Sequence, residues 1–565
     1  MATITKMARA HYEKGVPYEI AVPDTSLYLI LEESAQFYAD RPAIDYFGET
    51  LTYGELKDMV DRAAQVLRLA GVRRGDSVAI ALPNCPQHVI VFYALMRIGA
   101  VASEHNPLAP KSEIDHQVKR HKGRVAVVWE KVVNKFDFGP GQPIETMFTV
   151  DITYHMPKSK RALLALPIAP AKKTRSQMRS ETPSGTLSWD RKVRSAEPLD
   201  PTTPHATGDD IAVILHTGGT NGVPKSVPLT HRNIGANANQ NLAWVYRLHE
   251  GAESFFSLLP YFHSFGLTFF MVCAIKLAAS QVILPKFDVD LSLEAQKKTP
   301  VTFFVGVPPM FDRIARRAKE TGVDISSIRY AISGAMPLPR ETAEFWEEMT
   351  GGYIIEGYGM TETAPTMCGS PMTPERRHGA LGLPFPSTLM RLGDLADPNK
   401  EPEPGEPGEI LVKGPQVFSG YLDAPEDNAD AFTEDGYFRT GDIGVCDDGF
   451  VYLSDRRKEL ILSGGFNVYP SQVEAAIRTM PGVKDVAVVG LPTEKGEEVT
   501  AALVLDDGVN GLSLEDVRAW AEKRISHYAL PRSLAIVSEL PYSQIGKVMR
   551  RVVRENLLKD PRSKK

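Results

Sequence analysis

Residues 215–232 read Leu-His-Thr-Gly-Gly-Thr-Asn-Gly-Val-Pro-Lys-Ser-Val-Pro-Leu-Thr-His-Arg, directly after an apolar run that is typical of a buried strand. Glycines leave backbone N–H groups open to a ligand, and Thr217, Thr220 and Lys225 add further donors, so the stretch predicts a loop that wraps a polyphosphate. It is not a Walker loop, because that motif has glycine directly before its lysine and Pro224 stands here. For the stretch taken alone, an ordinary glycine-rich turn remains the alternative.

Length and composition limit the class of protein. A chain of 565 residues is too long for one core and predicts several structural units. Its net charge of −6 argues against nucleic acid as a partner, because no domain-wide positive field is available. The four cysteines, which lie far apart in the sequence, favour reduced thiols in a cytoplasmic protein over a disulfide framework or a zinc site. The first residues lack the apolar core of a signal peptide.

Strand and helix signals alternate along most of the chain, which is typical of α/β layers with largely parallel sheets. The expected early elements are a hairpin at 43–46 and 49–52, a helix at 53–69, a strand at 77–82 and a helix at 87–98. The expected later elements are strands at 211–215, 254–258, 281–285, 301–305 and 328–332 and helices at 264–278, 309–319 and 339–349.

The pattern changes at about residue 387, where short strands separated by Gly, Pro and Asp turns predict a compact β unit. The expected C-terminal elements are helices at 470–479, 513–525 and 547–557 and strands at 483–489, 499–505 and 533–537. We therefore expect a large N-terminal domain of α/β layered subdomains over 1–454, with the small β unit at about 387–454. A small, mobile α+β domain is expected over 455–565.

Two segments bear on membrane contact. The longest apolar stretch, 267–284, is interrupted by Lys276 and Gln281, and it predicts a buried helix and strand rather than a span. Segment 155–180 surrounds the apolar run 162–168 with many cations, so it is either a peripheral anchor on anionic lipid or a solvated insertion. Its prolines, Pro157, Pro167 and Pro170, exclude one long amphipathic helix. The prediction is a cytoplasmic protein with possible peripheral contact on the cytoplasmic membrane face.

Four further clusters carry chemical groups, and each has an ordinary structural explanation as well. His263 lies among aromatic residues and is by itself more typical of a core histidine. The segment 356–363 supplies a flat ring, hydroxyls and a carboxylate able to hold Mg²⁺ on phosphates, or a capped helix start. Asp442 lies in a tight turn, where it could accept ribose hydroxyls. Lys547 precedes a basic helix, and a nearby anion would explain a cation at that end.

Taken together and in this order, the loop and the four clusters resemble the adenylate-forming superfamily of acyl-CoA synthetases, luciferases and peptide-synthetase adenylation domains, from about residue 30 to 556. Within it, Thr-Gly-Gly-Thr at 217–220 and Asp-Arg-Arg-Lys-Glu-Leu-Ile-Leu-Ser-Gly-Gly-Phe-Asn-Val-Tyr-Pro at 455–470 are most similar to bacterial long-chain fatty-acid–CoA ligases. The resemblance implies ATP- and Mg²⁺-dependent ligation of a medium- or long-chain fatty acid to coenzyme A. An acyl-adenylate would be the intermediate, and AMP and pyrophosphate would be released.

The resemblance also implies roles for individual residues. The loop residues Thr217, Gly218, Gly219, Thr220, Asn221, Gly222 and Lys225 would wrap the β- and γ-phosphates. The adenine pocket would take Gly334, Ala335, Gly357 and Tyr358, with Gly359 in the same nucleotide-binding motif, while Asp442 would hold the ribose and Arg456 the ribose or a phosphate. The catalytic set would be Thr361 at the α-phosphate, Glu362 as the metal ligand, His263 beside the acyl carboxylate and Lys547 between carboxylate and α-phosphate. Lys458 would be the hinge of a rotating C-terminal domain.

Two departures from the family pattern affect the loop, because Asn221 replaces the usual threonine and Ser226 the usual glycine, whose added side chain could crowd the loop. Alternatives within the same superfamily are a fatty acyl-AMP ligase, an aryl-CoA ligase and a luciferase-like oxygenase. A catalytically silent, membrane-associated binding protein is the alternative from another class, although it would have no need of Lys547, Glu362 and Asp442 together. A homodimer is possible.

Overall fold

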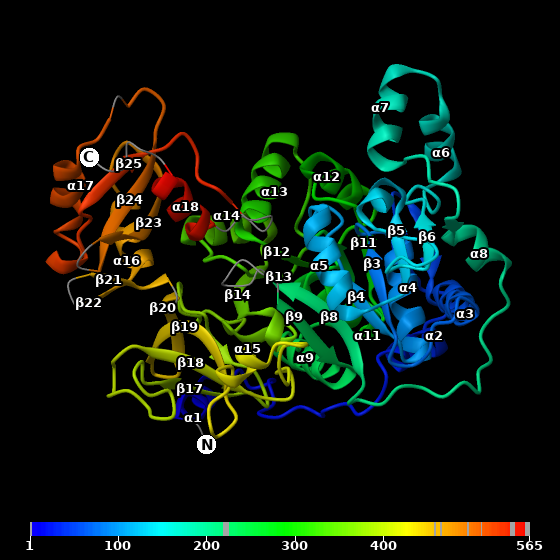
Figure 1. Ribbon diagram of the computed structural model, residues 1–565, viewed down its shortest axis with the longest axis horizontal. Coiled ribbons are helices and arrows are strands. Elements are labelled where there is room, and N and C mark those ends of the chain that lie inside the picture. Colours follow the sequence, from blue (N-terminus) through cyan, green and yellow to red (C-terminus); the bar gives the residue numbers. More distant parts are fainter. Residues whose placement is uncertain are drawn as a thin grey trace.

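The computed structural model describes residues 3–217, 225–456, 459–463, 466–493, 496–509, 511–542 and 548–559. Two large sheets, a small antiparallel sheet and a separate C-terminal unit make up this part of the chain (Figure 1). The predictions made for Gly218, Gly219, Thr220, Asn221, Gly222, Lys458 and Lys547 lie outside the described residues.

The nine-stranded sheet has the strand order β16-β15-β14-β13-β12-β10-β11-β1-β2. Its strands are β1 (Pro42–Tyr46), β2 (Glu49–Thr52), β10 (Ser254–Ser257), β11 (Ser280–Ile283), β12 (Phe303–Gly306), β13 (Tyr330–Ser333), β14 (Tyr353–Gly359), β15 (Thr366–Gly369) and β16 (Leu383–Pro384). The pairs from β1 through β14 are parallel, apart from the expected β1–β2 hairpin. Associated helices are α2 (Tyr28–Phe37), α3 (Tyr53–Leu69), α12 (Val289–Lys298), α13 (Pro308–Thr321) and α14 (Arg340–Thr350).

The seven-stranded sheet, β7-β6-β5-β3-β4-β8-β9, is parallel except for its edge pair β8–β9. Its strands are β3 (Ser77–Ala81), β4 (Val101–Glu104), β5 (Val125–Trp129), β6 (Thr146–Val150), β7 (Leu187–Ser188), β8 (Ile211–Thr217) and β9 (Lys225–Thr230). Alternate residues of β3 enter different cores: Val78 and Ile80 join the large core, whereas Ala79 and Ala81 join a second core that includes Ile114 of α5 (Lys111–His121). Both faces of the sheet are therefore buried, as expected for parallel strands.

Helices cover the seven-stranded sheet and connect it to the rest of the molecule. They are α4 (Pro86–Ile98), α5 (Lys111–His121), α8 (Trp189–Ser195) and α9 (His231–Trp244), with a 3-10 turn at Glu130–Lys135. Every residue of α4 is buried, and the hydroxyl of its Tyr93 donates to the backbone oxygen of Met271, 2.6 Å away. Because Met271 belongs to the buried helix before β11, α4 joins the two large sheets into one core.

The predicted helix at 264–278 is present as α10 (Ser264–Gly266), a π-helical segment Leu267–Cys273 and α11 (Ala274–Lys276). Its apolar middle is buried. Within the described ranges, the search for an apolar helix of membrane-spanning length finds none. The prediction that 267–284 is a core segment is therefore confirmed.

Segment 158–178 forms two short helices, α6 (Lys158–Ala165) and α7 (Ala169–Met178). Pro157 lies at the N-cap of α6, Pro170 lies in the first turn of α7, and Pro167 lies in the connection between them. The prediction that the prolines exclude one long helix is confirmed, because proline is tolerated only at these positions of a helix or outside it.

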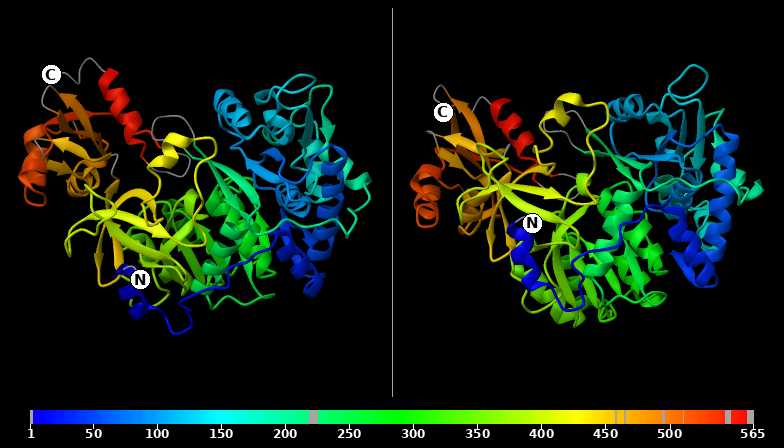
Figure 2. Two further views of the ribbon diagram at one scale, coloured as in Figure 1. Left: turned by 60° about the horizontal axis from the view of Figure 1, so that its bottom comes forward. Right: turned by 90° about the horizontal axis from the view of Figure 1, so that it is seen from below.

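A four-stranded antiparallel sheet follows, with β17 (Leu389–Gly393), β18 (Gly408–Lys413), β19 (Phe438–Asp447) and β20 (Phe450–Arg456). A short helix, α15 (Pro425–Ala429), lies in the connection before β19. The N-terminal helix α1 (Thr3–Ala8), continued by a 3-10 turn at Arg9–His11, docks beside β17, where the backbone N–H of Met390 donates to the hydroxyl of Thr5 at 2.8 Å. From there the chain crosses the molecule to α2 (Figure 2).

The C-terminal unit has the expected α+β pattern. It contains β21 (Ile461–Ser463), β22 (Phe466–Val468), α16 (Pro470–Arg478), β23 (Val483–Thr493), β24 (Gly496–Leu505), α17 (Leu514–Ala521), a 3-10 turn at His527–Ala529, β25 (Ser533–Ile536) and α18 (Arg550–Lys559). Alternate residues of β23 again face different cores: Val486 and Val488 pack with α16 and α17, whereas Ala487 and Val489 pack with α18. The predicted fold class, a large α/β unit followed by a small α+β unit, is confirmed.

Predicted and observed bounds agree within a few residues for most elements. The larger differences have local causes. Strand β23 extends to Thr493 because it pairs with Gly496 in a long hairpin, and the polar, proline-containing sequence there gives no apolar signal. The helix predicted at 513–525 begins close to the predicted residue, after a capping box at Ser513, and ends earlier, at Ala521. The division proposed at 454/455 falls inside β20 and stays a proposal.

Candidate active site

The predicted phosphate loop is carried by the edge hairpin of the seven-stranded sheet. Thr217 ends β8 and Lys225 begins β9, and the two residues are paired across the hairpin. The Nζ atom of Lys225 lies 2.6 Å from Oδ1 of Asp427 and 4.5 Å from the centre of the Tyr421 ring. In this arrangement, therefore, the Lys225 ammonium is held by an acidic side chain of α15 and an aromatic face.

Glu362 follows β14 in a 3-10 turn, Thr361–Thr363, and only 9% of its surface is exposed. Its Oε1 accepts a hydrogen bond of 2.9 Å from the hydroxyl of Tyr421. Burial raises the pKa of the Glu362 carboxyl, while the Tyr421 hydrogen bond and the positive charge of Lys225 act in the opposite direction. Tyr421 therefore links the predicted metal ligand to the predicted phosphate-binding lysine.

The donor set at Glu362 suits Mg²⁺ held on a polyphosphate. Magnesium sites of this kind take one or two protein carboxylates and complete their coordination with phosphate oxygens and water. Among the residues that the structure describes, no group of three or more His, Cys, Asp or Glu side chains is arranged to hold a metal by protein ligands alone. A Mg²⁺ ion that is bound mainly through phosphate oxygens requires only one or two protein carboxylates, and the buried Glu362 can supply one.

Glycines keep the end of the nine-stranded sheet free of side chains. Strands β13 and β14 are paired up to Ser333 and Glu356, so Gly334 and Gly357 follow side by side. A Cβ on Gly334 would lie 2.8 Å from the Phe265 ring and 3.2 Å from the backbone oxygen of Gly357. Ala335 takes the left-handed backbone conformation, with φ of 66°. The structure thus brings together the residues predicted for the adenine pocket.

Gly359, at the end of the same strand, is the most restricted position of the motif. A Cβ there would lie 2.0 Å from the backbone oxygen of Pro365, which no rotation of a side chain could relieve. The backbone N–H of Met360 donates to that oxygen at 2.9 Å and closes the turn. Gly359 therefore acts through close backbone approach, which fixes the turn that carries Thr361 and Glu362.

Asp442 lies in β19 and is buried. Its Oδ2 accepts a hydrogen bond of 2.6 Å from the hydroxyl of Tyr358, and the β19–β20 register places Arg456 directly opposite it. The structure therefore brings together Tyr358, Asp442 and the backbone of Arg456, which the sequence predicted for one nucleoside.

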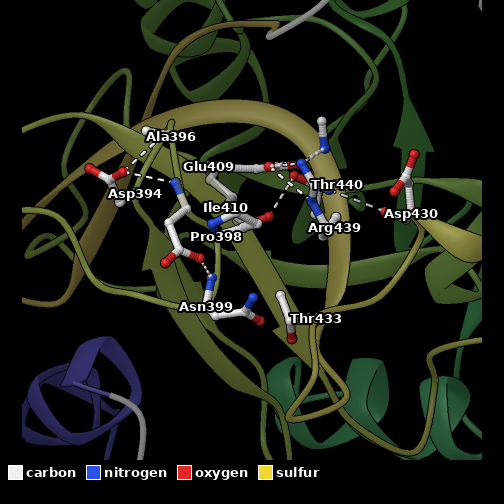
Figure 3. A network of polar contacts seen from close by, with 12 residues as sticks. Asp394, Ala396, Pro398, Asn399, Glu409, Ile410, Asp430, Thr433, Arg439 and Thr440 are labelled. Atoms are coloured by element: carbon white, nitrogen blue, oxygen red, sulfur yellow. Dashed lines mark hydrogen bonds and ion pairs between the residues drawn. The ribbon is translucent and has the colours of Figure 1, made fainter.

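A polar network fixes the turn before Asp442 (Figure 3). The carboxylate of Glu409, which is almost fully buried, accepts hydrogen bonds from Arg439 at 2.9 and 3.2 Å and from the backbone N–H of Gly441 at 3.1 Å. The Thr440 hydroxyl donates to the backbone oxygen of Ile410 at 2.7 Å and accepts from the N–H of Asp442 at 3.1 Å. These contacts hold Asp442 in place from the neighbouring strand β18.

His263 caps the short helix α10, and its Nδ1 accepts a hydrogen bond of 3.3 Å from the backbone N–H of Phe265. The Phe265 ring lies against Gly334, which brings the histidine turn to the predicted adenine pocket. Thr361 is half-buried at the start of the turn that holds Glu362, and its backbone oxygen accepts from Ala364 at 3.2 Å. Both residues thus lie on segments that border the site.

Ser226, one of the two departures from the family pattern, is buried and has a defined partner. Its Oγ lies 3.1 Å from Nδ1 of His216 across the base of the loop hairpin, and Nε2 of His216 lies 3.4 Å from the hydroxyl of Ser103. Burial lowers the pKa of His216 well below its usual value, with help from the nearby His105 and His121, so the ring is neutral near pH 7. A neutral imidazole can join two hydroxyls, since it has one donor and one acceptor nitrogen.

Sequence reasoning missed Tyr421, Asp427, Glu409 and His216. Tyr421, Asp427 and Glu409 lie outside the glycine-rich and acidic motifs. His216 lies in the loop stretch 215–232, but the sequence alone indicates no role for it. Tyr421 and Asp427 lie in the stretch 421–430, whose Asp, Asn and Pro residues are typical of an ordinary loop. Their contacts with Glu362 and Lys225 join residues far apart in the chain, and no local signal marks such pairs.

The glycine-lined sheet end, the buried acidic turn and the loop hairpin define a nucleotide-binding α/β enzyme. The chain matches the AMP-binding enzyme family over residues 31–422 and the AMP-binding enzyme C-terminal domain over residues 472–547. It belongs to the AMP-binding enzyme family.

Relatives with similar length are known in bacteria. The chain is 34% identical to a long-chain-fatty-acid–CoA ligase of Bacillus subtilis (strain 168), over 96% of each chain. It is 33% identical to a long-chain-fatty-acid–CoA ligase of Escherichia coli O157:H7, over 96% of this chain and 97% of that one. Among solved structures it is similar to ATP-bound MatB from Rhodopseudomonas palustris, with a TM-score of 0.77, 29% identity, and coverage of 94% of this chain and 99% of that one.

The Ser226–His216 contact yields a testable prediction. Ser226→Ala leaves Nδ1 of a partly buried ring without its partner, so the free energy of unfolding should fall by about 1–3 kcal/mol. If about 1.4 kcal/mol of this lost free energy stabilises the ATP-binding conformation of the loop in the wild type, its loss should weaken ATP binding, and KM for ATP should rise roughly tenfold. Urea unfolding and initial-rate kinetics measure both effects. Ser254→Ala is the matched control, because the buried Ser254 hydroxyl has no hydrogen-bond partner among the described residues; equal losses in both variants would contradict the prediction.

Tyr421→Phe tests the environment of Glu362. The variant keeps the ring below Lys225 but removes the hydrogen bond that lowers the pKa of Glu362, so that pKa should rise further. Because Mg²⁺ needs the carboxylate form, kcat/KM for MgATP falls as the pH falls through this pKa, and the fall should move to higher pH. Losing a hydrogen bond to a charged group, about 1.5 kcal/mol, corresponds to roughly a tenfold loss of kcat/KM. Tyr437→Phe, whose ring packs against Leu411, is the control; an unshifted acid limb for Tyr421→Phe would exclude this role.

Proposed function

We propose that the protein ligates a medium- or long-chain fatty acid to coenzyme A through an acyl-adenylate, with release of AMP and pyrophosphate. ATP and coenzyme A are the cosubstrates, and Mg²⁺ is the metal. The observation that carries the proposal is the full-length similarity to bacterial long-chain-fatty-acid–CoA ligases. The contacts of Glu362, Lys225, Tyr358 and Asp442 support it, because they form a nucleotide site on the fold of this family.

The chemistry follows from the leaving groups. A carboxylate is a poor acyl donor because its leaving group would be oxide, so its oxygen attacks the α-phosphorus of ATP and pyrophosphate leaves. The coenzyme A thiol then attacks the carbonyl of the mixed anhydride, and AMP leaves. Negative charge on the phosphate oxygens is stabilised by Lys225, by the loop N–H groups and by Lys547. No protein nucleophile is required; Cys85, Cys273 and Cys368 are buried, and Cys446, which is partly buried, lies in none of the motifs.

The individual roles form part of the proposal. Tyr358 and Asp442 hold the nucleoside, supported by their mutual hydrogen bond and by Arg456 opposite Asp442. Gly334, Ala335 and Gly357 border the adenine, and Gly359 fixes the turn that carries Thr361 and Glu362. Thr361 meets the α-phosphate, and Glu362 would hold Mg²⁺, which when bound neutralises phosphate charge. His263 borders the acyl carboxylate. Lys458 is the hinge of the C-terminal domain, 455–565, which rotates between the two half-reactions.

Two further properties of the whole protein form part of the proposal: a cytoplasmic location and association as a homodimer. The excess of acidic over basic residues gives no support to nucleic acid as a partner. Three of the four competing activities, a fatty acyl-AMP ligase, an aryl-CoA ligase and a silent binding protein, differ from the proposed ligase in their products and are separated by one assay.

That assay is pyrophosphate release across fatty acids of graded length and a panel of aryl acids, each with and without coenzyme A. We expect release with medium- and long-chain acids and an acyl-CoA product when the thiol is present. Release by aryl acids alone would overturn the substrate class. Acyl-AMP that accumulates unchanged in the presence of coenzyme A would identify an acyl-AMP ligase, and no release with any acid would identify a binding protein.

Lys547→Ala tests the division between the half-reactions. We expect adenylate formation to fall by about 10²–10³, or roughly 3–4 kcal/mol, because one charge-assisted contact in the transition state is lost. Thioester formation from supplied acyl-AMP should stay close to the wild-type rate, since the lysine meets the substrate in only one orientation of its domain. Lys559→Ala, an exposed lysine of α18, is the control. Equal losses in both half-reactions would contradict the assignment.

A further inference from the structure

The helices α6 and α7 form a hairpin in which Ala171 is the one buried residue. The hairpin projects from the molecule beside β5 and β6 of the seven-stranded sheet (Figure 1). The hairpin is closed on itself, because Arg175 of α7 donates to the backbone oxygen of Leu164 in α6 at 2.9 Å, and Ala171 is buried between the helices and their surroundings. The two helices therefore contact each other and form a defined structural element.

The base of the hairpin is anchored to the sheet. The indole N–H of Trp129 donates to the backbone oxygen of Met178 at 2.7 Å, and Lys131 donates to that of Ser176. Arg179 forms ion pairs of 3.0 Å with both Glu130 and Asp151. These contacts fix the C-terminal end of α7 and leave the opposite end, the connection between the helices, facing outward.

That outer end is apolar. Leu163, Leu166 and Ile168 expose 58%, 42% and 51% of their surfaces, and they lie within six residues of one another. Single exposed apolar side chains are ordinary on protein surfaces, whereas a cluster at the tip of a projecting element marks an interaction site. The turn contains Pro167 and offers no aromatic ring or acid to a protein partner.

Cations surround the apolar tip. Between residues 158 and 179 there is no acidic residue, and the basic residues are Lys158, Lys160, Arg161, Lys172, Lys173, Arg175 and Arg179. Lys160 and Arg161 lie over the rings of Phe47 and Tyr154, at 5.2 and 5.3 Å, and thereby fasten the base of α6. Lys158, Lys172 and Lys173 are exposed. This local excess of positive charge contrasts with the net charge of −6 of the whole chain.

We propose that the α6–α7 hairpin docks the protein on an anionic phospholipid membrane. The side chains of Leu163, Leu166 and Ile168 enter the boundary between headgroups and acyl chains, and Lys172 and Lys173 contact headgroup phosphates. Aliphatic residues at a convex tip beside exposed lysines suit a lipid surface, which needs no shape complementarity, better than an acidic protein. The proposal concerns binding alone and holds whatever acid the enzyme activates.

Vesicle flotation with the full-length protein tests the proposal. We expect flotation with vesicles of equal parts phosphatidylcholine and phosphatidylglycerol, weaker flotation with phosphatidylcholine alone, and a loss of binding as salt is added. The triple variant Leu163→Ser, Leu166→Ser, Ile168→Ser should lower the partition coefficient at least roughly tenfold, because three apolar side chains leave the interface. Its rate of pyrophosphate release with a water-soluble acid should not change, since none of these residues belongs to the active site.

A charge variant provides a second measurement that does not depend on the apolar tip. Lys172→Glu with Lys173→Glu should lower binding to anionic vesicles at least roughly tenfold and leave binding to neutral vesicles unchanged. The matched controls are Leu69→Ser with Leu108→Ser, which are exposed elsewhere, and Lys484→Glu with Lys523→Glu, which are exposed in the C-terminal unit. Wild-type partitioning by both hairpin variants would overturn the proposal. So would wild-type protein that fails to float with anionic vesicles but binds immobilised polyglutamate, which would indicate an acidic protein partner.

Discussion

The buried carboxylate of Glu362 imposes the strongest constraint on the molecule. A charge in the interior costs several kcal/mol unless hydrogen bonds and opposite charges accompany it. Here the hydrogen bond comes from Tyr421, and the positive charge comes from Lys225 on the other side of that ring. Glu362 lies between β14 and β15 of the nine-stranded sheet, Lys225 begins an edge strand of the seven-stranded sheet, and Tyr421 lies between β18 and β19 of the four-stranded sheet. The charge is therefore stabilised only when all three sheets are in place.

Backbone contacts maintain that arrangement with little freedom. The oxygen of Glu362 accepts from the N–H of Phe418, and the oxygen of Ser226 accepts from the N–H of Leu422, at 2.9 and 3.0 Å. The segment 418–422 is thus tied both to the acidic turn and to the loop hairpin. Gly359 adds a close approach of backbone to backbone that no larger residue allows. The strands are rigid, and these short connections hold the ends of β14 and β9 close together at the candidate site. Enzymes with parallel sheets generally form their ligand sites at strand ends in this way.

The sequence predicted what is local and missed what is distant. A short apolar run predicted β3, and short motifs shared with the adenylate-forming superfamily predicted Gly334, Tyr358, Glu362 and Asp442, because these signals lie within a few neighbouring residues. The Tyr421 hydroxyl on Glu362 and the Glu409 carboxylate behind Gly441 depend on which strands become neighbours, which the sequence alone does not determine. Ser226 shows the difference most clearly: by itself it looked like an obstruction, and its partner His216 gives it a defined position.

The C-terminal unit is held to the rest of the molecule by another buried carboxylate. Asp455, at the end of β20, accepts a hydrogen bond of 2.8 Å from the backbone N–H of Ser471 and lies 3.8 Å from Arg550. A rotation about Lys458 would separate Asp455 from both partners, whereas Arg550 would keep its ion pairs with Glu474 and Glu459, which lie beyond that position. The ion pairs within the small unit would then survive the rotation. If the unit rotates about Lys458 as we propose, Asp455 would act as a latch whose release leaves those pairs intact, which is a property that suits an enzyme with two working orientations.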